Sequence, residues 1–188
     1  MKKYPIIGCC GLDCGLCPRY YTKGRSKCNG CGSPTSRPNC SIFRCCVNVK
    51  GYETCAECGD FPCPRFKDAW EEYDSFLTHR KMRPNLKYIK EHGVESHVWR
   101  LRGRMRLLQK MLEEFNEGRS KSFYCIAVTL LPLENIKGSL DAAEKKVKEL
   151  NIGKEHIKTK AKILRDIINR IAESSNIDLK LRKPPKEK

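Results

Sequence analysis

Cysteine spacing is the feature that most constrains how this chain can fold. Twelve of its 13 cysteines lie between Cys9 and Cys63, a stretch that we call the cysteine cassette. Three pairs have the spacing C-x-x-C: Cys14/Cys17, Cys28/Cys31 and Cys55/Cys58. Two thiolates on one tight turn can share a metal ion. The glycine that ends CNGCG and CAECG permits the positive φ that such a turn often needs. Three such pairs with further cysteines between them indicate metal binding.

A disulfide framework is the alternative explanation of this cysteine density. The N-terminal sequence MKKYPIIGCCGLD has an apolar patch that is broken by Pro5 and ends before Asp13. A secretory signal needs about 7–15 apolar residues, so this patch is too short. The box Ile6-Ile7-Gly8-Cys9 fails as a lipoprotein signal for the same reason. We therefore expect a cytoplasmic protein whose thiols stay reduced and hold metal.

The cassette resembles a family of cysteine-rich bacterial and archaeal proteins that is known only as a domain of unknown function. Four similar blocks occur in the same order: CGLDCGLCP at 10–18, CNGC at 28–31, CSIFRC at 40–45 and CAECGDFPC at 55–63. The resemblance covers about residues 8–66 and implies metal binding through cysteines, with zinc as the usual assumption. Ten cysteines match the family pattern, namely Cys10, Cys14, Cys17, Cys28, Cys31, Cys40, Cys45, Cys55, Cys58 and Cys63. Cys9 and Cys46 are additional, and Arg44 stands one position away from the family's usual basic residue.

Zinc and an iron–sulfur cluster are the two metal centres that the cassette could hold. The paired C-x-x-C-G spacings favour zinc, whereas the dipeptides Cys17-Pro18 and Cys63-Pro64 are typical of ferredoxin-type clusters. The spacing of the first three pattern cysteines also matches the cluster motif of radical S-adenosylmethionine enzymes, but the barrel of alternating strands and helices that those enzymes need does not follow. The ten pattern cysteines predict two four-thiolate zinc sites. Cys9 and Cys46 would allow a third site, or each would be a buried thiol.

We expect structural metal sites rather than an enzyme. A catalytic zinc usually has histidine or carboxylate ligands and an open position, and the cassette contains no histidine. His92 and His97 are close enough in sequence to reach a metal, although ordinary core or surface histidines are more common. Cys125 lies in an apolar run with no pattern that identifies a base, so it is a core residue rather than a nucleophile. A binding or adaptor protein is therefore the expected function, with a redox protein as the alternative.

Apolar residues recur at helical spacing after residue 65. The fold class is therefore mainly α: an irregular, metal-stabilised, cysteine-rich module at 1–65, packed on a bundle of four to six helices at 66–177. A charged tail at 178–188 is expected to be disordered. The segment 122–131 fits either a strand or a buried helix, and we expect a helix. The other predicted helices are 66–81, 84–93, 94–115 with Gly118 as its cap, 134–150 and 154–173.

The chain is strongly basic, with a formal net charge of +16. Residues 1–65 contain ten lysines and arginines against four acidic residues, and metal-bound thiolates would offset part of this excess. The rest of the chain has 28 basic against 18 acidic residues and no such counter-charge. This excess fits binding to RNA or another polyanion, or a solvated surface that maintains solubility. No apolar run approaches the ~20 residues of a membrane span, so no membrane partner is expected.

The 94–115 helix carries a tryptophan among cations on the side opposite its apolar stripe. A tryptophan in such a setting can stack on a nucleobase, anchor a protein partner or be covered by another element. The sequence GRSKS at 118–122 resembles an anion-binding turn at a helix start, or an ordinary cap. The candidate polyanion-binding residues are Trp99, Arg102, Arg106, Lys110, Arg119 and Lys121.

Overall fold

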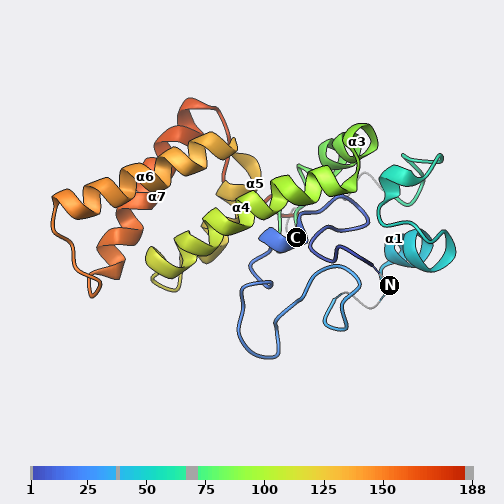
Figure 1. The fold of residues 1–188 in the computed structure, drawn as a ribbon, viewed down its shortest axis with the longest axis horizontal. Helices are drawn as coiled ribbons and strands as arrows, with labels where there is room; N and C mark the ends of the chain where they lie inside the picture. Colours follow the sequence, from blue (N-terminus) through green and yellow to red (C-terminus); the bar gives the residue numbers. More distant parts are fainter. Residues whose placement is uncertain (1, 37–38, 67–71, 185–188) are drawn as a thin grey trace. The chain divides into compact units, whose positions relative to one another are not determined.

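The computed structural model describes residues 2–36, 39–66 and 72–184. Within these ranges the chain is mainly helical and contains no strand (Figure 1), so the predicted mainly α class is confirmed. The chain divides into two compact units, which we call the first unit (Met1–Arg102 with Leu181–Lys188) and the second unit (Gly103–Lys180). This division falls within helix α4 (Val94–Glu114), whereas the sequence predicts a boundary at residue 65.

The cassette backbone is built from short helical turns. They are the 3₁₀ turn η1 (Cys14–Leu16), α1 (Ser41–Phe43), the π-helical turn η2 (Arg44–Val49) and the 3₁₀ turn η3 (Cys55–Glu57). The N–H of Cys17 donates to the carbonyl of Cys14 at 3.1 Å, and the N–H of Cys58 donates to that of Cys55 at 3.2 Å. Because a 3₁₀ turn brings residues i and i+3 onto one side, these two C-x-x-C pairs are held together locally. The third pair differs, since the N–H of Cys31 donates to the carbonyl of Pro5 at 2.7 Å.

Helix α3 (Met82–His92) supplies the main apolar surface of the first unit. It ends where predicted, at Gly93, whose φ is +83° and whose N–H donates to the carbonyl of Ile89 at 2.8 Å. Apolar residues of the first 65 positions contribute to the same core, so this loop-rich segment is not held by its thiols alone. The buried apolar residues of the first unit include Ile7, Leu16, Ile42, Leu77, Met82, Leu86, Ile89, Val98 and Leu101.

The predicted helix over 66–81 is wrong at residues 73–81, which form turns; residues 67–71 lie outside the described ranges. Asp74 explains the difference. Its carboxylate accepts hydrogen bonds from the N–H of His79 at 2.7 Å and from the hydroxyl of Thr78 at 3.3 Å. It also accepts from the backbone and guanidinium of Arg182, both at 2.9 Å. These bonds satisfy the local backbone in a non-helical turn. They also anchor part of the segment that the sequence predicted to be disordered.

Four longer helices follow: α4 (Val94–Glu114), α5 (Lys121–Leu130), α6 (Leu133–Glu149) and α7 (Ile157–Ser174). The ambiguous segment is therefore helical, as expected, and Tyr124–Leu130 are all buried in it. In the second unit, α6 packs against α7 and α5. The guanidinium of Arg104 donates to the carbonyls of Val128 and Leu131, which closes the C-terminus of α5.

No helix in the described parts of the chain is long and apolar enough to cross a membrane.

Candidate thiol-rich metal centre

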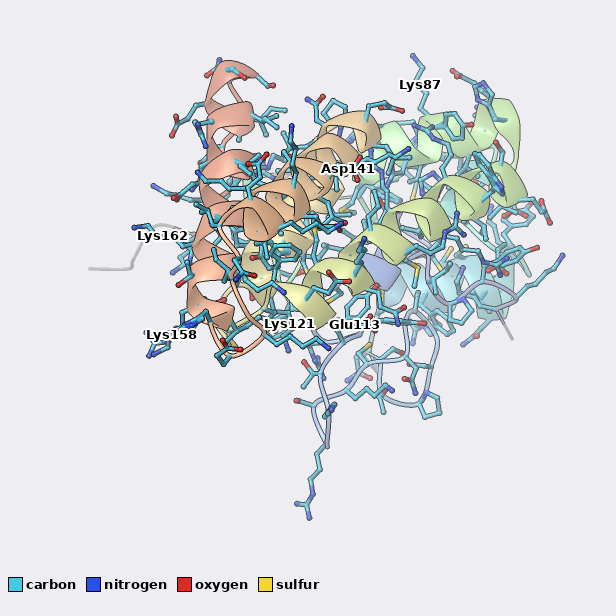
Figure 2. All side chains as sticks on the ribbon, turned by 60° about the vertical axis from the view of Figure 1, so that its left-hand side comes forward. Lys87, Glu113, Lys121, Asp141, Lys158 and Lys162 are labelled. Atoms are coloured by element: carbon cyan, nitrogen blue, oxygen red, sulfur yellow. The ribbon has the colours of Figure 1, made fainter. Side chains whose placement is uncertain are left out.

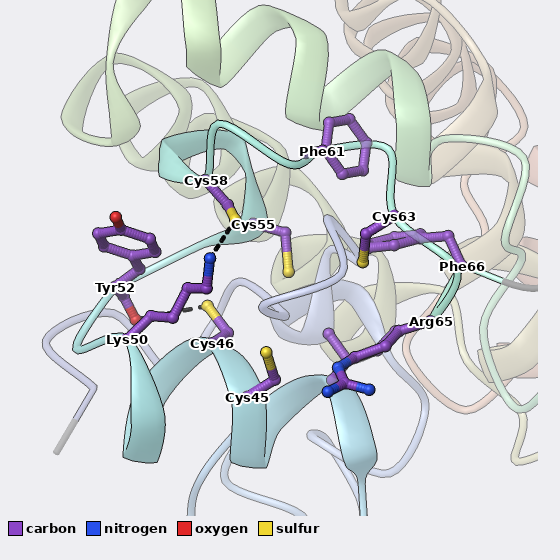
Figure 3. Close-up of a pocket in the computed structure, with 11 residues that line it drawn as sticks. Cys45, Cys46, Lys50, Tyr52, Cys55, Cys58, Phe61, Cys63, Arg65 and Phe66 are labelled. Atoms are coloured by element: carbon purple, nitrogen blue, oxygen red, sulfur yellow. Dashed lines mark hydrogen bonds between the residues drawn. The ribbon is translucent and has the colours of Figure 1, made fainter.

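Five cysteines line one small hollow in the first unit (Figure 3), and we call them the 45–63 thiol group. The group consists of Cys45, Cys46, Cys55, Cys58 and Cys63. Figure 3 shows their sulfur atoms turned toward the same space. The cavity at its centre measures about 20 Å³ and is also lined by Lys50, Arg65 and aromatic rings.

Local backbone geometry delivers these thiols to the hollow. Adjacent residues of η2 supply Cys45 and Cys46, and the turn after η2 is fixed by the N–H of Tyr52, which donates to the carbonyl of Cys46 at 2.8 Å. The η3 turn supplies the C-x-x-C pair and begins with a capping box between Thr54 and Glu57. Thr54 is fully buried, so this start of η3 is held within the fold and not only by local bonds.

Two cations lie against this thiol group. The ammonium of Lys50 donates to Asp60 Oδ2 at 2.7 Å and to Cys58 Sγ at 3.4 Å. These two partners, Asp60 first, raise the pKa of Lys50. A hydrogen bond to Cys45 and the nearby Cys63 raise the pKa of Arg65. The two cations therefore place positive charge beside a group of possible metal ligands, where metal-bound thiolates would carry negative charge.

The remaining pattern cysteines form a second cluster, the 10–40 thiol group, made of Cys10, Cys14, Cys17, Cys28, Cys31 and Cys40. Cys14 interacts electrostatically with four of the other members, and Cys10 interacts with Cys31 and Cys40. Burial raises the pKa of Cys10 to about 12, and burial also raises the pKa values of Cys14 and Cys17. Without a cation these thiols are therefore protonated at neutral pH.

The two C-x-x-C-G knuckles differ at their glycines. Gly32 has φ +79°, and a Cβ there would lie 2.5 Å from the ring of Phe43. Gly32 therefore supplies both the predicted backbone conformation and space for a packed ring. Gly59 is not among the positive-φ glycines and has open space around it, so the prediction fails at this knuckle.

The two additional cysteines connect the thiol groups: Cys46 belongs to the 45–63 thiol group, and Cys9 contacts one member of each group. Cys9 Sγ is 3.8 Å from Cys31 Sγ, and further side-chain hydrogen bonds join Cys9 to Cys46 and Cys46 to Cys55. The bond with Cys31 favours the Cys9 thiolate, but the bond with Cys46 and burial outweigh it and raise the pKa of Cys9 to about 12. A continuous chain of thiols thus links the two groups.

Lys2 is a buried cation at this link. Its side chain is only 2% exposed, and its ammonium lies 3.0 Å from Glu53 Oε1. Burial lowers the pKa of Lys2, but the thiol of Cys9 and the carboxylate of Glu53 more than offset that effect, and the pKa is raised. The ammonium therefore stays charged beside the linking thiols.

The two histidines considered as metal ligands have other partners. His97 Nε2 lies 2.8 Å from Asp13 Oδ1, with both side chains buried, and Asn85 donates to Asp13 Oδ2 at 3.0 Å. His92 stacks on Tyr88 with ring centroids 4.2 Å apart. The Asp13–His97–Asn85 network leaves no signal in the sequence, because its members come from the cassette, α3 and α4 and share no spacing pattern.

The cassette thiols have the donor chemistry of a metal site but not its spacing. All 13 cysteines lie in the described ranges, and all carry free thiols. As they stand, no three or more His, Cys, Asp or Glu side chains in these ranges are grouped closely enough to hold a metal. The donor chemistry of the 45–63 thiol group nevertheless fits a thiophilic ion, since its sulfur atoms share one hollow and two cations lie beside them. Closure around an ion would need the thiol side chains to turn further inward.

The structure divides the six candidate polyanion-binding residues between the two units. Trp99, which is 75% exposed, and the exposed Arg102 belong to the first unit. The other four belong to the second, where Lys110 lies 2.5 Å from Glu144 in a salt bridge. Arg119 lines a separate hollow with cations from α7. A single surface made of all six residues stays a prediction.

Several residues of the site were missed at the level of sequence. Lys50 and Arg65 were not singled out because basic residues are common throughout the chain, although Arg65 follows the last cassette cysteine by only two positions. Lys2 stands in a short basic N-terminal sequence with no pattern that relates it to the cysteines. Only the folded arrangement brings these cations to the thiols.

Comparison with known proteins gave no match to a family model, to a curated protein or to a solved structure.

Proposed function

We propose that this chain is a metal–thiolate protein of the cytoplasm in which zinc holds the cassette in shape. The observation that carries the proposal is the 45–63 thiol group, where five thiols and two cations surround one small cavity. Cys45, Cys55, Cys58 and Cys63 are its expected ligands. The 10–40 thiol group supplies the second set. The bound ion would supply cross-links to a segment that has only short helical turns of its own.

Cavity size favours zinc over an iron–sulfur cluster. The space at the centre of the 45–63 thiol group is about 20 Å³, which is close to the room needed by a single water molecule. One ion fits such a space, whereas a cluster of four irons and four sulfides needs the room of several water molecules. An iron–sulfur redox protein is therefore the alternative and would require this hollow to expand.

Charge compensation supports an all-thiolate site. A zinc ion with four thiolates carries two net negative charges. Lys50 and Arg65 supply two positive charges beside it, and the carboxylate of Asp60, which pairs with Lys50 at 2.7 Å, offsets one of them. Removing charged thiolates from water is costly unless cations or hydrogen bonds compensate them. The chain provides this compensation within its own first unit.

A binding or adaptor role fits the exposed side chains of the first unit better than catalysis does. Val49, Phe76 and Trp99 are 75%, 62% and 75% exposed. Large exposed apolar side chains can act as anchors for a partner. The thiol groups contain no histidine or free carboxylate ligand placed to leave a metal position open for a substrate.

Elemental analysis and visible absorption of protein purified without oxygen test the proposal. We expect colourless protein with about two or more zinc ions per chain, because each thiol group offers at least four sulfur ligands. Brown protein that contains iron and sulfide would support the redox alternative. Protein that carries neither metal when folded would contradict both assignments.

A further inference from the structure

The second unit contains a basic hollow whose lining includes no cysteine. Its lining comes from the α4–α5 connection and from one face of α7, and its volume is about 650 Å³. The lining residues include four cations, Arg119, Lys158, Lys162 and Arg165. This volume lies within the ~300–1,000 Å³ that is usual for small-molecule sites.

Helical spacing explains why α7 presents its cations together. Lys158, Lys162 and Arg165 are separated by four and three residues, so they lie on the same side of the helix. Figure 2 shows Lys158 and Lys162 extending from the same side of α7. The opposite side of α7 carries Leu164 and Ile168, which are fully buried. The basic side is therefore the side that faces solvent.

These cations are available to a ligand. No salt bridge occupies any of the four within the described residues. The guanidinium of Arg165 lies 5.3 Å from the centroid of the Phe123 ring, and this contact orients the side chain. The N–H groups of a guanidinium donate outward in its own plane, so they can still bind a ligand. Arg119 is exposed on the other wall of the hollow.

Glu117 gives the hollow a buried hydrogen-bond acceptor, which a surface made only of lysines and arginines lacks. Its Oε1 accepts a hydrogen bond from Ser120 at 2.9 Å, whereas its Oε2 is buried and has no hydrogen-bond partner in the described parts of the chain. A buried acceptor without a partner is unfavourable, and a ligand hydroxyl would satisfy it. Asn169 lies on the same lining and offers both a donor and an acceptor.

We propose that this hollow binds a sugar phosphate, meaning a phosphate monoester whose body carries hydroxyl groups. The four cations exceed the two lining carboxylates, Glu117 and Asp166, by two charges. A phosphate monoester carries about 1.5 to 2 negative charges at neutral pH, which matches that excess. The phosphate contacts Lys158, Lys162 and Arg165, and a hydroxyl of the sugar donates to Glu117 Oε2. This site is independent of the metal proposal.

Calorimetric titration of the full chain with ribose 5-phosphate, inorganic phosphate and ribose tests the site. We expect ribose 5-phosphate to bind more tightly than phosphate, and ribose alone to show no binding. Lys158→Ala/Lys162→Ala should weaken ribose 5-phosphate binding by about tenfold or more, because two charge-assisted hydrogen bonds are lost. The matched control Lys146→Ala/Lys148→Ala removes two exposed lysines from α6 and should leave the affinity unchanged.

Glu117→Gln separates the sugar contact from the phosphate contact. It should strengthen the binding of inorganic phosphate by removing a negative charge, and should reduce the preference for ribose 5-phosphate. An absence of ribose 5-phosphate binding by the wild type would overturn the proposal. Equal losses in the α7 variant and the α6 control would also overturn it. The proposal would also be overturned if Lys158→Ala/Lys162→Ala weakened the binding of single-stranded RNA but left the binding of ribose 5-phosphate unchanged. None of these results bears on the metal content.

Discussion

At the scale of single residues, positive charge accompanies the thiols. Lys50 lies beside Cys58, Arg65 beside Cys45 and Lys2 beside Cys9. Burial works in the opposite direction, since it raises the pKa values of thiols such as Cys10 and Cys14. A thiol must lose its proton to bind metal, so metal binding here releases protons. The cations reduce the free energy that this deprotonation requires.

Zinc affinity should therefore rise with pH. Burial raises the pKa of Cys10, an expected ligand, to about 12 in the metal-free state, so its thiol is protonated at neutral pH. Each proton displaced on binding makes the apparent affinity fall as pH falls. Competition with a chromophoric chelator at pH 6, 7 and 8 measures this dependence. An affinity independent of pH would show that zinc does not displace protons from these thiols.

Lys50→Met tests charge compensation directly. The variant keeps most of the apolar stem but removes the ammonium that donates to Cys58 Sγ at 3.4 Å. Zinc affinity should fall by about tenfold or more, in the range found for groups that support metal ligands. Chelator competition measures the change, with Lys23→Met as a control because Lys23 is exposed and lies away from the 45–63 thiol group. Equal zinc affinities of the two variants would show that Lys50 does not support metal binding.

Substitution of a pattern cysteine and substitution of an additional cysteine should have different effects on zinc content. Cys58→Ser removes a ligand of the 45–63 thiol group and should release about one zinc ion per chain. Cys9→Ser replaces a buried thiol that hydrogen-bonds to Cys31, so it should cost only about 1 kcal/mol of stability and keep two zinc ions. Zinc content and thermal unfolding of both variants provide the comparison. Loss of an ion from the Cys9 variant would favour a third site at the linking thiols.

At the scale of elements, local periodicity and long-range bonds compete. Tyr73 and Leu77 continue an apolar spacing that predicts a helix, but the carboxylate of Asp74 turns the chain at His79 and pairs with Arg182. In α5 the helical pattern is realised, and the guanidinium of Arg104 donates a hydrogen bond to the carbonyl of Leu131 at the C-terminal end of the helix. A side-chain acceptor with several donors can therefore override a helical pattern that is only one or two turns long.

Asp74→Asn should loosen the turn at 74–79 together with the segment around Arg182. Burial raises the pKa of Asp74, but its bonds from Arg182 and His79 outweigh burial and lower it below the usual value. A carboxyl with a lowered folded-state pKa contributes stability above its unfolded pKa of about 3.9, and that contribution is lost as pH falls through the folded value. We expect about 1–2 kcal/mol at pH 7. Amide exchange of residues 74–79 measures it, with a difference between variant and wild type that disappears in acid.

At the scale of the whole molecule, the two units depend on different sources of stability. The second unit buries a continuous apolar core in which Tyr124 is fully buried and donates its hydroxyl hydrogen to the carbonyl of Phe115 at 2.9 Å. The cassette has short turns and only a few buried apolar residues, among them Leu16, Ile42 and Ala56. Metal cross-links would therefore matter to the cassette and have little influence on the second unit.

Chelation should separate these contributions. Stripping zinc with a strong chelator under reducing conditions should abolish amide protection across residues 8–65, because structural zinc in small domains supplies ~10–16 kcal/mol of apparent binding free energy. Protection in Gly103–Lys180 should persist. Hydrogen exchange followed by mass spectrometry reports both units in one experiment. Persistent protection of the cassette after metal removal would show that its apolar core suffices.

The sequence by itself determined the helices with long apolar repeats, such as α4 and α7, and the C-x-x-C turns, because these depend on neighbours within a few positions. It also determined that the thiols gather in the first third of the chain. Tertiary structure decided which cations reach those thiols, that Asp74 replaces a predicted helix by a turn, and that Arg119 lines the same hollow as Lys158 and Lys162. These contacts join residues far apart in the chain. They depend on how buried surfaces pack together, and the spacing of residues close together in the sequence does not specify that packing.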